Sequence, residues 1–475
     1  MMSVWRKKPI AAYQAEATKS DLNRVLTRWG LTSLGIGAII GGGIFTLTGI
    51  AAHDHAGPAL ALAFVIAGIG CLFASLCYAE FASVLPVEGS AYAYAYGTIG
   101  ELFAWFIGWN LILEYMMGAT TVAVAWSGYF NKLLHLFGIN LPDYLVNDPS
   151  THGGPAFNLP AFLITWVVTG ILIKGIKEAA STNNLIVILK VGVVLFVIIA
   201  GAFYVDTANW TPFIPEVTTG SDGMPHFGVG GVLTAATIVF FAYIGFDAVS
   251  TQAGEAINPK KDVPFAIIAS LIICTILYVA VSLVLTGMVK YDQLDLKAPV
   301  ASAFSGAGIT WAVYLITIAA TAGLMSVMLV MMLGQTRIFL GMSKDGLLPK
   351  NIFGKLHPTF KTPYRSTILI GGIISLTAAL TPIEKISEMC SMGTLLAFSM
   401  VCLAVLILRI KEPTLDRPYK TPAIWFVAPA GVLFNIFLMT QVRIQTWYTF
   451  IIWGVLGVLV YFLYSRRHSN LEPKK

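Results

Sequence analysis

Apolar stretches of about twenty residues recur along the whole chain and alternate with short polar segments. A stretch of that length is enough for a helix to cross the hydrocarbon core of a membrane. The pattern therefore predicts an all-α integral membrane protein with twelve transmembrane helices. The predicted spans are 30–52, 58–82, 100–130, 158–176, 183–205, 227–252, 264–288, 308–341, 364–381, 386–409, 422–441 and 445–464.

The basic residues give this arrangement an orientation. With the N-terminus placed in the cytoplasm, 24 of the 30 Lys and Arg residues fall in the two tails or in the loops after spans four, six, eight and ten. Five fall on the other side, and the remaining one is Lys190. Such an asymmetry is typical of membrane proteins, whose cytoplasmic loops carry the excess of Lys and Arg. We expect a multi-pass protein of the cell membrane with both termini in the cytoplasm.

Composition agrees with this prediction, because 57% of the residues are hydrophobic and 11% are charged. The net charge of +6 follows from the loops and gives no reason to expect nucleic acid. Residues 1–28 show no signal-peptide pattern, so the first span is expected to act as an uncleaved signal. The five cysteines form no CxxC pair and indicate neither a disulfide nor a metal framework. His53-Asp54-His55 has a metal-like spacing, but two imidazoles without a further ligand nearby favour a solvated loop.

Glycine interrupts two of the spans. Span one contains Gly41–Gly43 near mid-membrane, where each glycine costs about 1 kcal/mol of helix stability relative to alanine. Unwinding there would expose backbone groups, which only a protein-lined cavity tolerates. Close helix packing through Gly37 and Gly41 is the alternative. Span six carries a second interruption in Phe240–Asp247, with Gly245 and an acidic residue inside an apolar stretch.

The two interruptions lie five spans apart, so each occupies the first helix of a five-helix unit. Paired interruptions in matching positions of two halves are typical of a transporter binding site. Because each unit has an odd number of helices, the second unit must be inverted relative to the first. Half-helix N-termini attract an anion and unwound carbonyls can take a cation, so the site suits a small zwitterion.

Four sets of motifs occur in order along the chain. They are the glycine-rich break; Pro86-Val87-Glu88-Gly89-Ser90-Ala91-Tyr92 with Gly100-Glu101 and Gly108 to Tyr115; Gly245-Phe246-Asp247 with Glu255 and Asn258-Pro259; and Gly334-Gln335-Thr336-Arg337 with Asp345 to Pro349. At these residues the chain resembles the amino acid–polyamine–organocation superfamily, most closely bacterial relatives of the cationic amino acid transporters. Two positions depart from the pattern: Gly42, where many relatives have Ser or Thr, and Gly254, where relatives often have an acid.

The resemblance implies a leucine-transporter-type fold that works by alternating access in an inner membrane. Two inverted five-helix repeats would cover residues 30–206 and 227–410, and two extra helices would lie in 421–465, between tails 1–29 and 466–475. The substrate carboxylate would meet the amides of Gly41, Gly42 and Gly43. The ammonium would meet carbonyls near Ile39, Ile40, Phe241, Ala242 and Ile244. Phe241 would also be an aromatic gate over the substrate.

Lys190 is a lone cation in the apolar segment 184–205, and an ionisable group in a span is a functional hypothesis by default. The resemblance places it where sodium-coupled relatives hold Na⁺ between helices one and eight, and it matches the lysine of proton-coupled members. A protonated lysine there could bind the unwound carbonyls of span one. Because burial disfavours the charged amine, proton release and uptake would become feasible and could be linked to the conformational cycle. The alternative is a lysine that snorkels to the cytoplasmic surface.

Three further residues bear on the substrate. Glu114 in span three faces either the pocket or a hydroxyl on a neighbouring helix. Asp247 is expected to hold the halves of span six together through backbone N–H groups, as a helix cap does. The resemblance puts Met331 near the substrate side chain, where a bulky, flexible residue favours a small or medium apolar substrate. Ordinary packing is the alternative for Met331, and an acid at Glu114 would instead attract a cationic side chain.

These observations predict a secondary active transporter that moves L-amino acids by proton symport, with neutral amino acids preferred. The alternatives are a cationic amino acid transporter or exchanger, and a transporter-like amino acid sensor. A membrane enzyme would need converging catalytic groups within the bilayer, and a channel would need a continuous polar pore. The expected partners are an amino acid, a coupling proton and the lipid bilayer. We expect no cofactor, no metal and no enzyme activity, and the sequence does not fix the oligomeric state.

Overall fold

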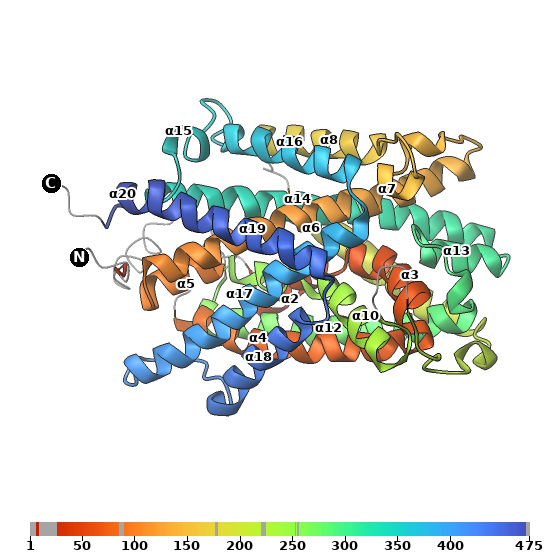
Figure 1. The fold of residues 1–475 in the computed structure, drawn as a ribbon, viewed down its shortest axis with the longest axis horizontal. Helices are drawn as coiled ribbons and strands as arrows, with labels where there is room; N and C mark the ends of the chain where they lie inside the picture. The colour runs from red at the N-terminus through yellow and green to blue at the C-terminus, as the bar shows by residue number, and fades with distance from the viewer. Residues whose placement is uncertain are drawn as a thin grey trace.

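The computed structural model describes residues 6–8, 26–84, 90–175, 179–219, 225–251, 253 and 256–471. Regular structure in these residues is almost entirely helical, apart from a short hairpin of Thr218–Thr219 (β1) and Pro225–His226 (β2) (Figure 1). Eight of the helices in the described ranges are long and apolar enough to cross a membrane, and three shorter helices are also apolar. The protein is therefore a helical membrane protein that crosses the bilayer several times.

The first part of the chain begins with a helix that is interrupted at Ile40 and continues beyond Gly43. In chain order the helical elements are α2 (Arg28–Ile39), η1 (Gly43–Leu47), α3 (Thr48–Ile50), η2 (Ala51–Ala56), η3 (Gly57–Ala59), α4 (Leu60–Val84), α5 (Ser90–Thr98), α6 (Glu101–Leu136), η4 (Asp143–Leu145), α7 (Pro149–His152), α8 (Leu159–Lys174), α9 (Ala179–Ala202) and η5 (Thr207–Trp210).

The second part also begins with an interrupted helix, which follows the hairpin. Its helical elements are α10 (Gly228–Phe240), η6 (Phe241–Tyr243), α11 (Ala248–Thr251), α12 (Pro259–Met288), η8 (Tyr291–Gln293), α13 (Pro299–Gly306), α14 (Thr310–Lys344), α15 (Lys350–Phe353), α16 (Tyr364–Leu380), α17 (Ile383–Lys411), α18 (Ile424–Met439), α19 (Ile444–Val460), η9 (Tyr461–Ser465) and α20 (Arg466–His468).

Some boundaries differ from the predicted spans. Helix α6 runs to Leu136, beyond the predicted end at residue 130, and a separate helix α5 precedes it that was not predicted. Helix α12 begins at Pro259 instead of residue 264, because proline at the first helical position needs no N–H partner. The motif residues Pro86–Gly89, Gly254 and Glu255 lie outside the described residues.

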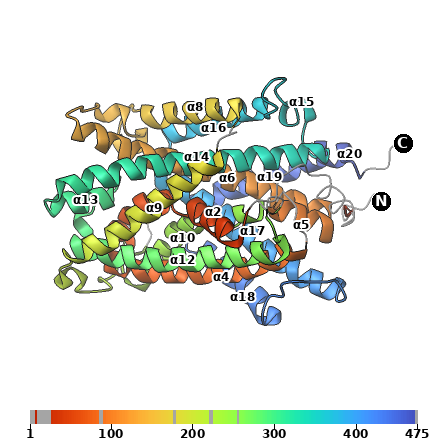
Figure 2. The ribbon, with the colours of Figure 1, turned by 180° about the vertical axis from the view of Figure 1, so that it is seen from behind.

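Helices from the two parts of the chain pack against each other in pairs. Helix α4 packs on α12, α6 on α14, and α8 on α16. Figures 1 and 2 show the α8–α16 pair along one edge of the molecule in both views. Helices α6 and α14 run antiparallel, because Tyr314 Oη donates to Leu136 O (3.0 Å) at one end and Gln335 Nε2 to Ile112 O (3.2 Å) at the other.

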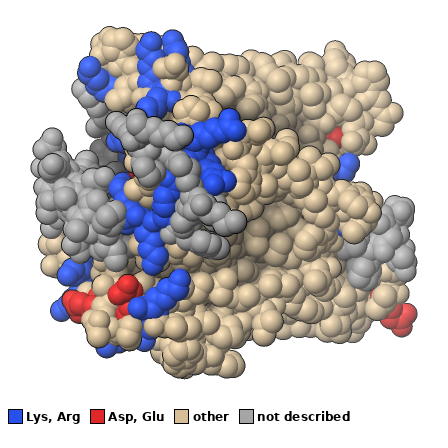
Figure 3. Space-filling model, turned by 60° about the vertical axis from the view of Figure 1, so that its left-hand side comes forward, with Lys and Arg blue, Asp and Glu red and all other residues tan. Residues whose placement is uncertain are grey.

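Both chain termini lie at one end of the molecule (Figure 1), and Lys and Arg side chains gather over that end (Figure 3). Segments next to the two termini meet there at Glu101, the first residue of α6. Its carboxylate accepts hydrogen bonds from Tyr96 (3.2 Å), Tyr461 (3.1 Å) and Ser469 (2.5 Å). Arg6 lies 3.8 Å from it, and the Arg6 carbonyl accepts from the Glu101 amide (2.8 Å). We call these five residues the Glu101 cluster.

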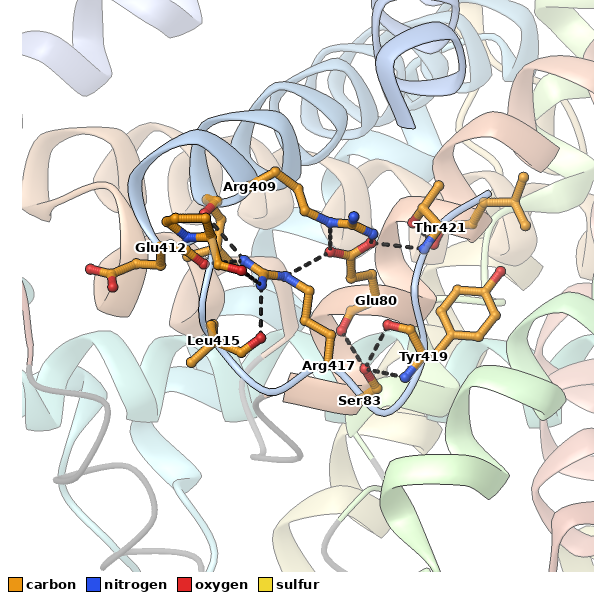
Figure 4. Close-up of polar contacts among 11 residues, drawn as sticks. Glu80, Ser83, Arg409, Glu412, Leu415, Arg417, Tyr419 and Thr421 are labelled. Atoms are coloured by element: carbon orange, nitrogen blue, oxygen red, sulfur yellow. Dashed lines mark hydrogen bonds and ion pairs between the residues drawn. The ribbon is translucent and has the colours of Figure 1, made fainter. Parts of the chain in front are cut away.

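A second buried acid, Glu80 on α4, binds the segment that connects α17 to α18 (Figure 4). Arg409 of α17 donates to both of its carboxylate oxygens, at 2.6 and 2.8 Å. Arg417 Nε lies 3.2 Å from Oε1, and the Thr421 amide donates to Oε2 at 2.8 Å. The remaining donors of Arg417 bond to backbone carbonyls, among them those of Leu415 and Glu412. The connection after α17 is thereby fixed to α4.

Candidate functional site

The two predicted helix interruptions lie side by side in the structure. Gly43 of the first packs so tightly on Ala242 of the second that a Cβ atom at Gly43 would collide with the Ala242 backbone. At Gly245 a Cβ atom would lie 2.8 Å from the carbonyl of Ala38. Going forward along the second helix from Ala242 to Gly245 thus corresponds to going back along the first helix from Gly43 to Ala38. The two interrupted helices therefore run in opposite directions.

This antiparallel pairing extends to both ends of the interrupted helices. At one end the amide of Phe227 donates to the carbonyl of His55 (2.8 Å). At the other end the amide of Ile257 donates to the carbonyl of Leu26 (2.9 Å). Contacts between the helices thus occur at both ends and at the interruptions, which meet near the middle of the pair.

In the first interruption the helix stops at Ile39, and Ile40 takes an extended conformation with ψ 104°. Helical structure resumes at Gly43 as one turn of π-helix. The amides of Gly41 and Gly42 donate no hydrogen bond to the backbone of the described residues. These are two of the three amides that the family resemblance assigns to a substrate carboxylate, and the geometry leaves them available to an acceptor.

The second interruption is longer. Helix α10 ends at Phe240, a single 3₁₀ turn follows, and Ile244 is extended with ψ 133°. Gly245 then adopts φ +123°, a conformation that L-residues with a Cβ rarely adopt. Helix α11 begins three residues later, at Ala248.

Side chains from other helices satisfy the carbonyls that the end of α2 leaves exposed. A helix end has up to four carbonyls without an intrahelical partner. Lys190 Nζ donates to Gly37 O at 2.9 Å, and Tyr278 Oη donates to Ile39 O at 2.9 Å. A cation at a helix C-terminus also interacts favourably with the helix dipole.

Lys190 is enclosed by three helices. Its exposed fraction is 0%, and a Cβ atom at Gly323 of α14 would lie 3.0 Å from its Cγ. Val187, one turn earlier on α9, packs against Gly37 of α2. The ammonium therefore lies between α2, α9 and α14 and does not extend to the protein surface, as a snorkelling side chain would.

Tyr278 of α12 joins the two interruptions and was not identified from the sequence. Its hydroxyl lies 2.9 Å from Ile39 O and 3.0 Å from Ala242 O. Both are carbonyls that the family resemblance assigns to the substrate ammonium. A buried tyrosine in an apolar span usually finds a hydrogen-bond partner, which is the one signal that could have drawn attention to it.

The residue Gly42 faces three apolar side chains. A Cβ atom there would lie 3.3 Å from Ala125 Cβ of α6, and 3.8 Å from both Leu324 Cδ2 of α14 and Phe241 Cε1. The Phe241 ring therefore lies beside the first interruption, as the prediction of a gate requires. Its role as a gate remains a prediction.

Met331 lies further along the same pair of helices. A Cβ atom at Gly118 of α6 would be 3.6 Å from Met331 Sδ and 3.6 Å from Cys390 Sγ of α17. Gly118 and Ala125 are seven residues apart, or about 10 Å along the helix. Met331 is thus separated by about that distance from the part of the site where Phe241 meets Gly42.

Glu114 lies one helical turn from Gly118 and is fully buried. Neither of its carboxyl oxygens has a hydrogen-bond partner among the described residues. The Thr394 hydroxyl of α17 lies near this carboxyl but donates to Cys390 O at 3.0 Å. A buried acid without a hydrogen bond can accept one from a bound ligand or carry a proton itself.

Asp247 makes a contact that was not predicted. Its Oδ2 accepts from the Tyr115 hydroxyl of α6 at 3.2 Å, which connects the second interruption to α6. The amides of Gly245 and Ala248 also lie near the carboxyl, where the predicted helix cap would bond. The capping role stays a prediction.

Two surface cavities lie away from the helix interruptions. A cavity of about 450 Å³ is lined by residues that include Asn209, Lys290 and Ser302, and one of about 630 Å³ by Arg28 and residues 257–262. No group of three or more His, Cys, Asp or Glu side chains in the described part of the chain could hold a metal ion. The interruptions and the α6–α14 faces beside them therefore form the candidate site.

Comparison with known proteins agrees with a transport site. A family model described as amino acid permease matches residues 26–461. The chain is 46% identical over 474 residues to the branched-chain amino acid permease BcaP of Bacillus subtilis (strain 168), with 99% of each chain covered. It is 43% identical over 472 residues to the methylthioribose transporter of the same organism, covering 99% of this chain and 100% of the relative. It is 39% identical over 417 residues to the vacuolar cationic amino acid transporter 2 of Arabidopsis thaliana, covering 86% of this chain and 64% of that protein. None of these relatives is named as an enzyme. The chain belongs to the amino acid permease family.

Proposed function

We propose that the protein is a secondary active transporter of L-amino acids that works by alternating access around the two helix interruptions. The observation that carries this proposal is the contact between the interruptions, which brings amides and carbonyls of two half-helices together. The amides of Gly41 and Gly42 suit a carboxylate, and the carbonyls of Ile39 and Ala242 suit an ammonium. A zwitterion could engage both without any charged side chain.

We further propose twelve spans arranged as two inverted repeats, residues 30–206 and 227–410, with two more spans in 421–465. Support comes from the antiparallel pairing of the interrupted helices and from the packing of α4 on α12, α6 on α14 and α8 on α16. A two-fold relation between inverted repeats would bring matching helices together in this way. The spans would be α2 to η2, α4, α6, α8, α9, α10 to α11, α12, α14, α16, α17, α18 and α19.

We propose that the protein lies in the cell membrane and that the end carrying both termini faces the cytoplasm. Tails 1–29 and 466–475 would then lie inside the cell. Support comes from the gathering of Lys and Arg over that end in Figure 3. Juxtamembrane Lys and Arg are enriched in cytoplasmic loops.

We propose that Lys190 carries the coupling proton. Its ammonium bonds to Gly37 O, a carbonyl exposed only because α2 stops at Ile39. Protonated Lys190 would hold α2 against α9 and α14, and loss of the proton would leave Gly37 O without this donor. Protonation would then favour one arrangement of these helices over another, which is the requirement for coupling.

We propose a preference for neutral amino acids. The Met331 thioether against Gly118 narrows the space between α6 and α14 and presents an apolar, adaptable surface. The second candidate is a cationic substrate, which the buried Glu114 carboxyl would favour, since neither of its oxygens has a hydrogen-bond partner among the described residues. The names of the relatives include both branched-chain and cationic amino acids.

The test is uptake of a labelled amino acid panel by the purified protein in liposomes, with and without an inward proton gradient. We expect uptake of alanine and leucine to rise with the gradient. Lys190→Ala should lose this dependence while it still exchanges substrate in counterflow. Lys290→Ala is the matched control, because Lys290 is 52% exposed and pairs with Asp292; it should behave like the wild type.

Each part of the proposal can fail separately. Full gradient dependence in Lys190→Ala would rule out the coupling role, and strong competition by unlabelled arginine would overturn the neutral preference. An amino acid that stabilises the protein without counterflow would indicate a sensor instead of a transporter.

A further inference from the structure

Two histidines from distant parts of the sequence face each other at the end of the molecule opposite the termini. The rings of His55 and His226 have centroids 4.9 Å apart and are inclined by 55°. His55 belongs to η2, at the end of the first interrupted helix, and His226 to β2, just before α10. The sequence draws attention to His53 and His55, but His53 Nδ1 instead pairs with the adjacent Asp54 carboxylate (2.5 Å).

The backbone holds this pair of rings in place. Next to His226, the amide of Phe227 donates to His55 O at 2.8 Å. A Cβ atom at Gly231 of α10 would collide with the same carbonyl, so η2 and α10 are in close contact. His55 itself is 6% exposed. A ligand that needs both imidazoles would find them already assembled, and such preorganisation favours affinity.

The separation of the rings suits a metal ion. Zn–N bonds of about 2 Å in a tetrahedral arrangement place two imidazole ring centroids about 5 Å apart. Neutral imidazole is a preferred ligand of Zn²⁺, Cu²⁺ and Ni²⁺. We propose that His55 and His226 form a two-histidine site for a divalent transition-metal ion of the Zn²⁺ class.

His55 and His226 would supply two of the ligands of the ion; the search of the described residues finds no group of three or more His, Cys, Asp and Glu around them. A bound ion would cross-link η2 to β2, at the ends of the two interrupted helices. This inference does not depend on the transport proposal, since binding can be measured on the purified protein.

The test is a titration with ZnCl₂ of the full chain in detergent, purified without a histidine tag. Isothermal titration calorimetry should report one Zn²⁺ per chain, and the unfolding temperature should rise with Zn²⁺, because an ion that binds only the folded protein stabilises it. Mg²⁺ should have no effect at this site, since it prefers oxygen ligands. His55→Ala and His226→Ala should each weaken Zn²⁺ binding by at least about tenfold.

The matched control is His53→Ala, which removes the neighbouring imidazole and should leave Zn²⁺ affinity unchanged. A second variant, His55→Cys with His226→Cys, guards against an alanine variant that fails to fold. It should bind Cd²⁺ more tightly than the wild type, because thiolates are the softer ligands. Failure of the wild type to bind Zn²⁺, wild-type affinity in either alanine variant, or no gain of Cd²⁺ binding in the cysteine variant would overturn the proposal.

Discussion

At the scale of single residues, Tyr278 has the contact that most directly connects the two interruptions. Its hydroxyl reaches one carbonyl of each, Ile39 O and Ala242 O. A hydroxyl has a single proton to donate. At any moment, therefore, one of the two carbonyls lacks the Tyr278 proton and can accept from another donor, such as a substrate ammonium.

Tyr278→Phe should therefore weaken both stability and transport. Loss of the hydroxyl leaves buried carbonyls without their donor, and each unsatisfied group costs about 1–3 kcal/mol. We expect a lower unfolding temperature in detergent and a lower rate of alanine uptake in liposomes. Tyr314→Phe is the control, since Tyr314 bonds to Leu136 O at the far end of α14; equal effects of the two substitutions would contradict this assignment.

The sequence predicted those residues of the site whose chemistry is unusual in a membrane. Gly41–Gly43 and Gly245 are poor helix formers inside predicted spans, and the structure has an interruption at each. Lys190 is conspicuous because a charge in a span is expensive. Tyr278 has no such signal, because tyrosine is an ordinary residue of an apolar helix. The partner of Asp247 was also missed, since Tyr115 lies 132 positions away and only the fold brings it near.

At the scale of elements, Glu80 shows how one buried acid determines the path of a connection. Glu80 is buried on α4, and its ligands come from α17 and from the segment that follows it (Figure 4). The guanidinium groups of Arg409 and Arg417 both pair with this one carboxylate. The sequence does not indicate these partners, which are more than 300 positions away from Glu80.

Glu80→Gln should destabilise the protein strongly. Removing one charge of a buried ion pair leaves the other uncompensated, which typically costs about 3–5 kcal/mol. The side chain of Arg417 is 2% exposed and cannot turn to solvent without local unfolding. Thermal unfolding in detergent measures this effect. Asp292→Asn, at a surface pair with 52% and 48% exposure, should cost less than about 1 kcal/mol; a comparable loss in both variants would show that burial is not the cause.

At the scale of the whole molecule, the Glu101 cluster connects the two ends of the chain. Arg6 lies near the N-terminus, Tyr461 and Ser469 lie near the C-terminus, and all three approach the carboxylate at the start of α6. The alternating access proposed above requires that this end of the protein open and close. The cluster would be formed when the end is closed and would have to separate when it opens.

Truncation after His468 should therefore loosen this end. It removes the Ser469 hydroxyl from Glu101 and the Asn470 amide from Asp345 O (3.0 Å). We expect faster amide hydrogen exchange in residues 90–101, because exchange reports the free energy of local opening. The internal control is residues 159–174 of α8, which should exchange at the wild-type rate. Unchanged exchange in residues 90–101 would mean that the tail does not hold this end closed.

The interruptions have a consequence for how such a binding site can diverge. The groups proposed to hold the carboxylate and the ammonium are main-chain atoms of Gly41, Gly42, Ile39 and Ala242, which every amino acid except proline supplies. A point mutation can abolish them only if it introduces proline or redirects the main chain. Variation in the neighbouring side chains, such as Met331 and Glu114, leaves them intact. New specificities can therefore arise by drift at a few positions, while recognition of the common amino acid backbone is inherited unchanged.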